Sequence, residues 1–216
     1  MASKRYTPAL GFASLSDWYD LAIKVTMPER RIRAKLVDHL VPEAGEHILE
    51  FGFGTGTNLL VAANRCSDCH LIGLDIDPKM REIAAKKLSR HSFNIPLELY
   101  DGGEFPFESG TFDKVYSCLV FHHLDKASKI WSMREIHRLL KPGGRFVLGD
   151  WGKAKTKTLR NAFYMVQFLD GFATTNDNVN GLIPEYLSSA GFSEVQEAEY
   201  INSMLGTFTY HVCSRT

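Results

Sequence analysis

The sequence predicts an α/β fold in which a largely parallel sheet is covered by helices on both faces. The first observation is that strand-like apolar runs alternate with helical patterns between residues 45 and 150. The second is a glycine turn, GFGTG, which ends one such strand at Phe51 and opens a helix at Thr57. The third is that 216 residues, 44% of them hydrophobic, suit one domain with a full core, since no linker, repeat or low-complexity segment interrupts the chain.

Helices are predicted before the first strand. Residues 13–25 and 28–41 both show helical spacing, and the second run has Pro28 in the first turn and Ile32, Leu36 and Leu40 on one face. Strands at 47–51, 71–75 and 95–100 then alternate with helices from 57 to about 65 and from 78 to about 90. Because proline cannot donate to a ladder, Pro96 predicts that the third strand lies at an edge of the sheet.

The second half of the chain begins with the same alternation and then departs from it. We expect a strand at 112–118, a helix from 126 to about 140, a turn at 141–144 and a strand at 145–150. Two helices at about 156–171 and 180–190 follow, and then strands at 193–200 and 206–213. The single domain therefore divides into N-terminal helices (1–44), a ligand-binding core (45–150), a substrate-side helical lid (151–191) and a C-terminal hairpin (192–216).

Charge and composition exclude several classes of partner. Twenty-five basic and twenty-five acidic residues give a formal net charge of zero, whereas nucleic-acid binding usually requires a basic domain or stripe. The N-terminus lacks the apolar region of a signal peptide, and no stretch approaches the ~20 apolar residues that span a bilayer. We expect a cytoplasmic protein that binds no nucleic acid and is not inserted in a membrane.

Cys66, Cys69 and His70 form a C-x-x-C-H motif, which can attach haem in exported chains. The motif falls between a predicted helix and a predicted strand, and a second pair of ligands at metal spacing is missing. The sequence therefore predicts reduced thiols in a connection rather than a haem, redox or metal site.

The glycine turn reads E-x-G-x-G-x-G, from Glu50 through Gly52, Gly54 and Gly56. The dinucleotide fingerprint G-x-G-x-x-G/A fails in both registers, because its third small residue falls on Thr57 or Leu59. A glutamate beside the loop would repel a pyrophosphate, yet it could accept a hydrogen bond from an ammonium group. The turn therefore favours a ligand that carries an amine.

Two further carboxylates follow predicted strands. Asp75 ends the second strand, where an acidic residue in this topology can bind both hydroxyls of a ribose, and Asp101 follows the third. Asp77 directly precedes Pro78 and is better suited to cap the next helix. Since open α/β sheets bind ligands at the carboxyl ends of their strands, Glu50, Asp75 and Asp101 together indicate a binding site.

Four segments in this order, ILEFGFGTG, LIGLDIDPKM, FPFESGTFDKVYS and LLKPGGRFVLGDW, resemble the class I S-adenosylmethionine-dependent methyltransferases. The likeness is to the small-molecule branch typified by the ubiquinone/menaquinone biosynthesis and phosphatidylethanolamine enzymes. It implies a Rossmann-like sheet of seven strands with one antiparallel strand near the C-terminus, and S-adenosylmethionine as cofactor. Phe53 departs from the pattern, since smaller residues are frequent at its position.

The resemblance also implies roles for individual residues. Glu50 and the glycines at 52, 54 and 56 would hold the methionine part, and Asp75 the ribose. Ile76 would pack on the adenine, whose edge Asp101 and Gly102 would contact. Cys118, Leu119 and Val120 would line the methionine side.

The chemistry that follows is direct displacement at an activated methyl group, which requires the protein to align a nucleophile and exclude water. If the acceptor must lose a proton, His122 and His123 are the candidate bases, with a structural role as the alternative. An aromatic set favours a lipophilic or aromatic acceptor such as a quinol, a phenol or a phospholipid, although any one member can be core. The set comprises Trp18, Tyr19, Trp151, Phe163, Tyr164, Phe168 and Phe172.

Three alternatives stay open at the level of sequence. A nucleic-acid or protein methyltransferase is disfavoured because the fourth strand is not followed by an Asn/Asp-Pro-Pro-aromatic motif. A regulatory module that binds the cofactor without turnover would keep the same motifs. The cations Lys24, Arg30, Arg31, Arg33 and Lys35 are interpreted as a solvated helix face, with peripheral contact to a membrane surface as the second interpretation.

Overall fold

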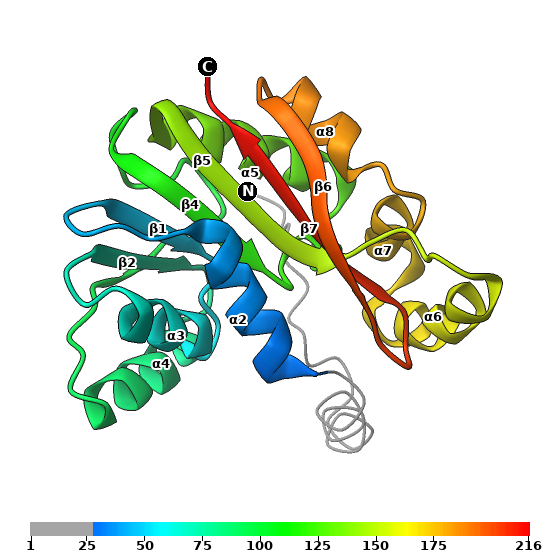
Figure 1. The fold of residues 1–216 in the computed structure, drawn as a ribbon, viewed down its shortest axis with the longest axis horizontal. Coiled ribbons are helices and arrows are strands. Elements are labelled where there is room, and N and C mark those ends of the chain that lie inside the picture. The colour runs from blue at the N-terminus through cyan, green and yellow to red at the C-terminus, as the bar shows by residue number, and fades with distance from the viewer. Residues whose placement is uncertain (1–27) are drawn as a thin grey trace.

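A seven-stranded sheet with the order β3-β2-β1-β4-β5-β7-β6 forms the centre of the molecule (Figure 1). The computed structural model describes residues 28–216. All neighbouring strands pair in parallel except β7, which runs antiparallel to both β5 and β6. The predicted fold class, including the antiparallel strand near the C-terminus, is confirmed.

The elements follow one another in chain order as α2 (Glu29–Leu40), β1 (His47–Phe51), α3 (Thr57–Arg65), β2 (His70–Asp75), α4 (Pro78–Arg90), β3 (Leu97–Leu99), β4 (Phe112–Cys118), the short 3-10 helix η1 (Phe121–His123), α5 (Lys126–Leu139), β5 (Leu140–Trp151), α6 (Lys157–Asp170), α7 (Phe172–Val179), α8 (Ile183–Ser189), β6 (Ser193–Asn202) and β7 (Thr207–Ser214).

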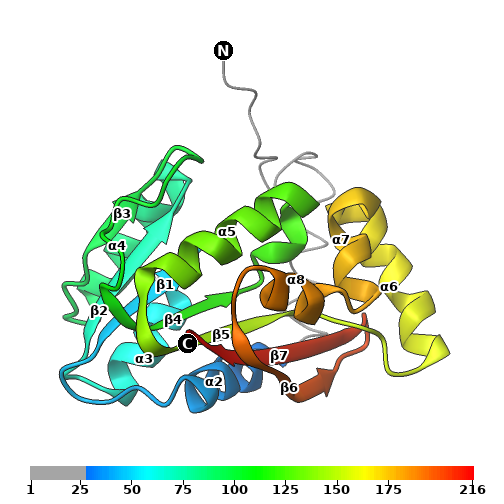
Figure 2. The same cartoon turned by 90° about the horizontal axis from the view of Figure 1, so that it is seen from above.

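Helices cover both faces of the sheet (Figure 2). On one face, α2, α3 and α4 bury Leu36, Leu59 and Ala84 in a cluster with Ile48 of β1. On the other face, α5 and α8 bury a second cluster with the alternate residues of the same strands. Side chains of successive strand residues point to opposite faces, so each central strand contributes to both clusters. The helices α6 and α7 lie beyond the carboxyl end of β5 (Figure 1).

Most predicted elements are present, with three differences. The strand predicted at 95–100 is shorter, because it pairs only over Leu97–Leu99 at the sheet edge; Pro96 precedes it and contributes its carbonyl to Gly73 N. The turn expected at 141–144 belongs to β5, which pairs with β4 across a register shift between Phe112 and Lys114. The helix expected at 13–25 is not counted among these differences, because it lies outside the described residues.

The third difference is α7, which the sequence did not predict. Its residues FATTNDNV are poor helix formers, since Thr, Asn and Asp favour caps and turns. Tertiary contacts hold it instead: Asn178 Nδ2 donates to Trp151 O at 3.0 Å, and Gln167 Nε2 donates to Thr175 Oγ1 at 3.2 Å. Buried Lys129 of α5 also donates to the α7 backbone at Thr174 O.

The prediction of reduced thiols at Cys66 and Cys69 is wrong, because the two residues form a disulfide. Helix α3 ends at Arg65 and β2 begins at His70, and in the four-residue connection between them the cysteine Cα atoms lie 5.7 Å apart, within the range that a disulfide spans. The predicted location of the pair, between a helix and a strand, is confirmed. Across residues 28–216, none of the helices has the length and apolar character needed to cross a membrane.

Candidate active site

The glycine loop connects β1 to α3 at the carboxyl edge of the sheet. Gly52, Gly54 and Gly56 have φ angles of 74°, 51° and 73°, which other residues rarely adopt. A Cβ at Gly52 would lie 2.3 Å from Val120 Cγ2, whereas a Cβ at Gly54 would meet no atom within 4 Å. The middle of the loop therefore faces open space where a ligand can approach the backbone.

Phe53, the residue that departs from the family pattern, is buried inside the loop. Its ring lies against β2 at Gly73, where a Cβ would come within 2.6 Å of Phe53 Cδ1. The absence of a side chain at Gly73 thus makes room for the large residue in the loop. The departure changes packing under the loop and leaves its ligand side open.

Asp75, at the end of β2, is hydrogen-bonded to the glycine loop. Its Oδ2 accepts a hydrogen bond from Gly54 N at 2.7 Å, and its Oδ1 accepts from Ile76 N and Asp77 N at 2.7 and 3.0 Å. Burial raises the pKa of this carboxyl, and the three backbone donors oppose that effect. Asp77 caps α4 by accepting from Lys79 N at 2.8 Å, as predicted.

The residues after β3 lie beside those after β2. A Cβ built at Gly102 would be 3.7 Å from Ile76 Cδ1, so the Ile76 side chain covers this backbone. Asp101 is exposed, and its Oδ1 accepts from Gly103 N at 3.0 Å. The structure therefore brings Asp75, Ile76, Asp101 and Gly102 to one edge, next to the glycine loop.

Glu50 occupies a different position from these groups, because it is fully buried behind the loop. Its Oε1 accepts from Asn58 Nδ2 at 2.8 Å and its Oε2 from Tyr116 OH at 3.1 Å. Arg33 of α2 in turn donates to Asn58 Oδ1 at 2.6 Å. Burial raises the pKa of Glu50 to about 8. Both carboxylate oxygens are engaged within the protein, so its predicted contact with an ammonium group stays a prediction.

The end of β4 forms the side of the site opposite Asp75. Cys118 is buried, and burial raises the pKa of its thiol. Leu119 follows with φ 57°, a left-handed conformation that costs a branched residue about 1–2 kcal/mol. Its N–H donates to Gly149 O at 2.9 Å. The strained backbone turns the chain away from the sheet and places Val120 against Gly52.

Two carboxylates flank His122. Its Nδ1 lies 2.7 Å from Asp150 Oδ1, and its Nε2 lies 3.8 Å from Asp170 Oδ2 at the end of α6. Asp150 also accepts from the backbone N–H groups of His122 and Trp151, which orients its carboxylate. Burial lowers the pKa of His122, but the charge of Asp150 and its hydrogen bond outweigh that effect and raise it. The two acids therefore favour the protonated form of His122.

His123 has the opposite electrostatic environment. Its ring packs against that of His122 at an interplanar angle of 44°, with centroids 3.9 Å apart, and it is partly exposed. Burial, and the charge that His122 carries when protonated, lower the pKa of His123 to about 3. At neutral pH His123 is therefore uncharged, and one of its ring nitrogens can accept a hydrogen bond.

The predicted aromatic set divides into a buried and an exposed group. Trp151 and Phe163 pack edge-to-face with centroids 5.3 Å apart and are almost fully buried in the core. Tyr164, Phe168 and Phe172 are exposed on α6 and at the start of α7. Trp18 and Tyr19 lie outside the described residues. Sequence spacing alone did not separate the two faces of α6, since both are apolar.

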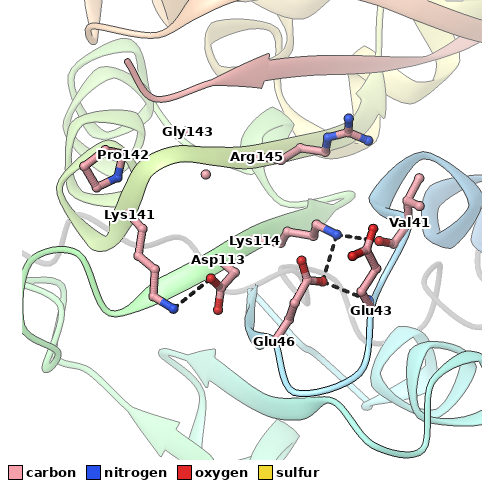
Figure 3. Close-up of a pocket in the computed structure, with 10 residues that line it drawn as sticks. Val41, Glu43, Glu46, Asp113, Lys114, Lys141, Pro142, Gly143 and Arg145 are labelled. Atoms are coloured by element: carbon pink, nitrogen blue, oxygen red, sulfur yellow. Dashed lines mark hydrogen bonds and ion pairs between the residues drawn. The ribbon is translucent and has the colours of Figure 1, made fainter.

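A hollow of about 420 Å³ lies at the opposite, amino edge of the sheet (Figure 3). Most of its charged side chains have partners: Lys114 bonds to Glu46 at 2.8 Å, and Lys141 bonds to Asp113 at 2.7 Å. Arg145 donates to His39 O at 3.1 Å. Its position, away from the glycine loop, separates this hollow from the candidate active site.

The sequence missed two residues that connect these groups. Asn58 and Tyr116 hold Glu50, and neither was predicted to contribute to the site. The position of Asn58 in the first turn after the glycine loop was a usable signal. For Tyr116, 66 positions from Glu50, no local signal existed.

Comparisons with known proteins match this chain to methyltransferases. A family model described as a methyltransferase domain matches residues 48–144. The chain is 30% identical over 194 residues to demethylmenaquinone methyltransferase of Symbiobacterium thermophilum, covering 78% of this chain and 75% of that protein. It is 28% identical over 158 residues to the ubiquinone/menaquinone biosynthesis C-methyltransferase UbiE of a Geobacter species, covering 71% of this chain and 66% of that one.

Among solved structures, phosphoethanolamine N-methyltransferase 2 of Haemonchus contortus, in complex with phosphomonomethylethanolamine and S-adenosylhomocysteine, superposes with a TM-score of 0.68 at 16% identity. The match covers 85% of this chain and 52% of that one, so this chain corresponds to about half of that enzyme. At this identity the likeness shows the fold.

Proposed function

Because the chain belongs to the class I S-adenosylmethionine-dependent methyltransferases, we propose that it methylates a small lipophilic or aromatic acceptor by direct in-line displacement. The observation that carries the proposal is the open glycine loop at Gly54, whose N–H is held 2.7 Å from Asp75 Oδ2. The cofactor supplies an activated methyl group. The relatives named for quinone biosynthesis support a quinol or phenol as the acceptor class.

The residues at the carboxyl edge fit this cofactor. A carboxylate has about four acceptor positions, and the three backbone donors on Asp75 leave room for a ribose hydroxyl. Ile76 beside Gly102 forms an apolar surface for the adenine, next to the exposed carboxylate of Asp101. We assign the methionine side to the glycine loop and to Cys118 and Leu119. Glu50 supports that loop from behind through Asn58, at the start of α3.

We assign different roles to the two histidines. His122 is a positioning residue, because Asp150 and Asp170 engage both of its ring nitrogens. His123 is neutral and partly exposed, so it is the member that can hydrogen-bond an acceptor hydroxyl. Its low pKa makes it a poor proton acceptor, so we assign it the role of accepting a hydrogen bond that orients the acceptor hydroxyl rather than of removing the proton.

The membrane-contact interpretation of the cations near α2 receives less support from the contacts. Arg33 pairs with Glu29 at 3.3 Å and bonds to Asn58, and Lys35 pairs with Glu199 at 3.2 Å. These cations serve interactions within the chain, which favours the solvated-face interpretation of the cluster.

A labelled-methyl assay over quinols, phenols, amines and phospholipids tests the proposal. We expect turnover of quinols or phenols, with His123→Ala lowering kcat by about tenfold to a hundredfold and leaving cofactor affinity unchanged. Turnover of amines alone would contradict the acceptor class. Cofactor binding without turnover of any compound would indicate a regulatory module.

A further inference from the structure

Helix α6 is apolar on two opposite faces. Its inner face buries Phe163 and Val166 against the core. We call the exposed apolar residues on its other side, together with the first residue of α7, the outer stripe. The outer stripe consists of Tyr164 (48% exposed), Met165 (62%), Phe168 (80%), Leu169 (39%) and Phe172 (47%). A helix that is apolar all round is normally buried on all sides.

The outer stripe is continuous rather than scattered. Tyr164 and Phe168 are four positions apart, as are Met165 and Leu169, so these four share the outer side of α6. Phe172 begins α7 after Gly171, and its ring lies 6.3 Å from that of Tyr164, which adds it to the same surface. Single exposed apolar residues need no explanation, but a contiguous patch marks a contact surface. Both views place α6 at the outside of the molecule, beyond the end of β5 (Figures 1 and 2).

The chain that precedes α2 can reach this surface. The first turn of α2 is connected to the inner face of α6 through β7. Tyr210 OH of β7 donates to Ile32 O of α2 at 2.9 Å. The ring of Phe208, on the same strand, lies 6.5 Å from that of Trp151, which contacts Phe163 of α6. Twenty-seven residues precede the described part of the chain. With residues 18–25 helical, that part rises about 10 Å at 1.5 Å per residue, and the three steps from residue 25 to residue 28 add up to about 10 Å, so Trp18 can lie roughly 20 Å from the start of α2.

The sequence of residues 13–25 complements the outer stripe. Leu15, Trp18, Tyr19 and Ala22 recur at helical spacing and would form one apolar face. Asp17 and Asp20 lie between them along the chain, and Lys24 follows near the end of the segment, which leaves a formal net charge of −1.

Helix α6 has the opposite charge near the outer stripe. It begins with Lys157 and carries Arg160, whose guanidinium stacks on Tyr164 at 4.1 Å, and Asp170 is its one acidic residue. An amphipathic segment with acidic residues therefore matches an apolar stripe with basic residues at its start.

We propose that residues 13–25 dock as a helix on the outer stripe of α6, with Trp18 and Tyr19 in the contact. This contact closes the apolar surface within one copy of the chain and joins the N-terminal segment to the helical lid. It does not depend on the identity of the methyl acceptor, and its test requires no activity.

Hydrogen exchange measured by mass spectrometry on the full chain tests the contact. We expect the amides of residues 13–25 to be protected, and Phe168→Glu to lower their protection by tenfold or more. Trp18→Ser should have the same effect. Ile83→Glu is the matched control, since Ile83 is an exposed apolar residue on α4 at the other end of the molecule and should leave the protection unchanged. Circular dichroism confirms that each variant is folded.

Three results would overturn the proposal. The first is free-peptide exchange of residues 13–25 in the wild type, or protection that Phe168→Glu does not change. The second is a dimer, measured by light scattering, that Phe168→Glu dissociates while residues 13–25 are unprotected, because a second copy would then cover the stripe. The third is Phe168-dependent sedimentation with phosphatidylcholine–phosphatidylserine vesicles while residues 13–25 are unprotected, since lipid would then be the occupant.

Discussion

Substitution of Asp75 by alanine tests whether this carboxylate binds the cofactor, with the helix cap at Asp77 as the comparison. In the structure Asp75 accepts hydrogen bonds from the backbone N–H groups of Gly54, Ile76 and Asp77. Alanine removes the acceptor that holds the middle of the glycine loop and, by our assignment, the acceptor of a ribose hydroxyl. The neighbouring Asp77 only caps α4, through Lys79 N, and provides a matched control close to the same loop.

The expected loss follows from the number of hydrogen bonds. A hydrogen bond to a charged group contributes about 1.5–3 kcal/mol, so the loss of the one ribose contact for which Asp75 has room weakens binding by about 1.5–3 kcal/mol. At about 1.4 kcal/mol for each factor of ten, the Kd for S-adenosylmethionine should rise roughly tenfold to 150-fold. Asp77→Ala should lower the free energy of unfolding by about 1 kcal/mol through the lost cap and change that Kd by less than about threefold.

Isothermal titration calorimetry with S-adenosylmethionine measures both affinities, and titration with NAD tests the choice of cofactor. Denaturant unfolding of each variant confirms that binding is measured on folded protein. The assignment of the ribose to Asp75 is refuted if Asp75→Ala binds as tightly as the wild type, or if both variants lose affinity equally. Tighter binding of NAD would refute the cofactor assignment itself.

Three further predictions concern the loop and α6. The pKa of Glu50 is raised to about 8 in the folded state, so its contribution to stability is lost as pH rises from about 5 to 8. Urea unfolding should therefore show that the free energy of unfolding declines less steeply with pH in Glu50→Gln than in the wild type, by up to about 1.4 kcal/mol per pH unit. Gly52→Ala should weaken cofactor binding in calorimetry and lower the melting temperature, since the new methyl would lie 2.3 Å from Val120 Cγ2; an unchanged melting temperature would contradict this close contact. Phe163→Ala should cost about 3–5 kcal/mol of unfolding free energy and Phe168→Ala less than about 1 kcal/mol, and equal losses would show that α6 is oriented differently.

Sequence reasoning succeeded where the signals are local. The strand before Gly52 and the cap of α4 at Asp77 and Pro78 were predicted at the correct positions, because these residue types act on the backbone at or next to their own positions. Glycine permits a positive φ, proline fixes φ, and aspartate accepts from the free N–H groups of a helix start. The alternation of strands and helices likewise specified a parallel sheet. The order of its motifs then indicated the cofactor through family resemblance.

Pairing between distant residues was not predictable in this way. Glu50 was expected to face the ligand, but Tyr116 and Asn58 enclose it, and Tyr116 comes from another strand. The charge on His122 likewise depends on Asp150, 28 positions further along the chain. Helix α7 forms from residues of low helix propensity, since buried hydrogen bonds to other elements hold it.

The sequence by itself determined where the strands begin and end around the glycine loop, and which carboxylates follow them. Only the tertiary structure decided which of those carboxylates remain accessible, in which direction the pKa of each histidine shifts and which face of α6 is exposed. The physical reason is that backbone preferences act between near neighbours, whereas burial and pKa depend on side chains that folding brings together. Asp75 and Glu50 show the difference, because both lie at or near the end of a strand, yet Asp75 accepts from the loop backbone at Gly54 whereas Asn58 and Tyr116 enclose Glu50.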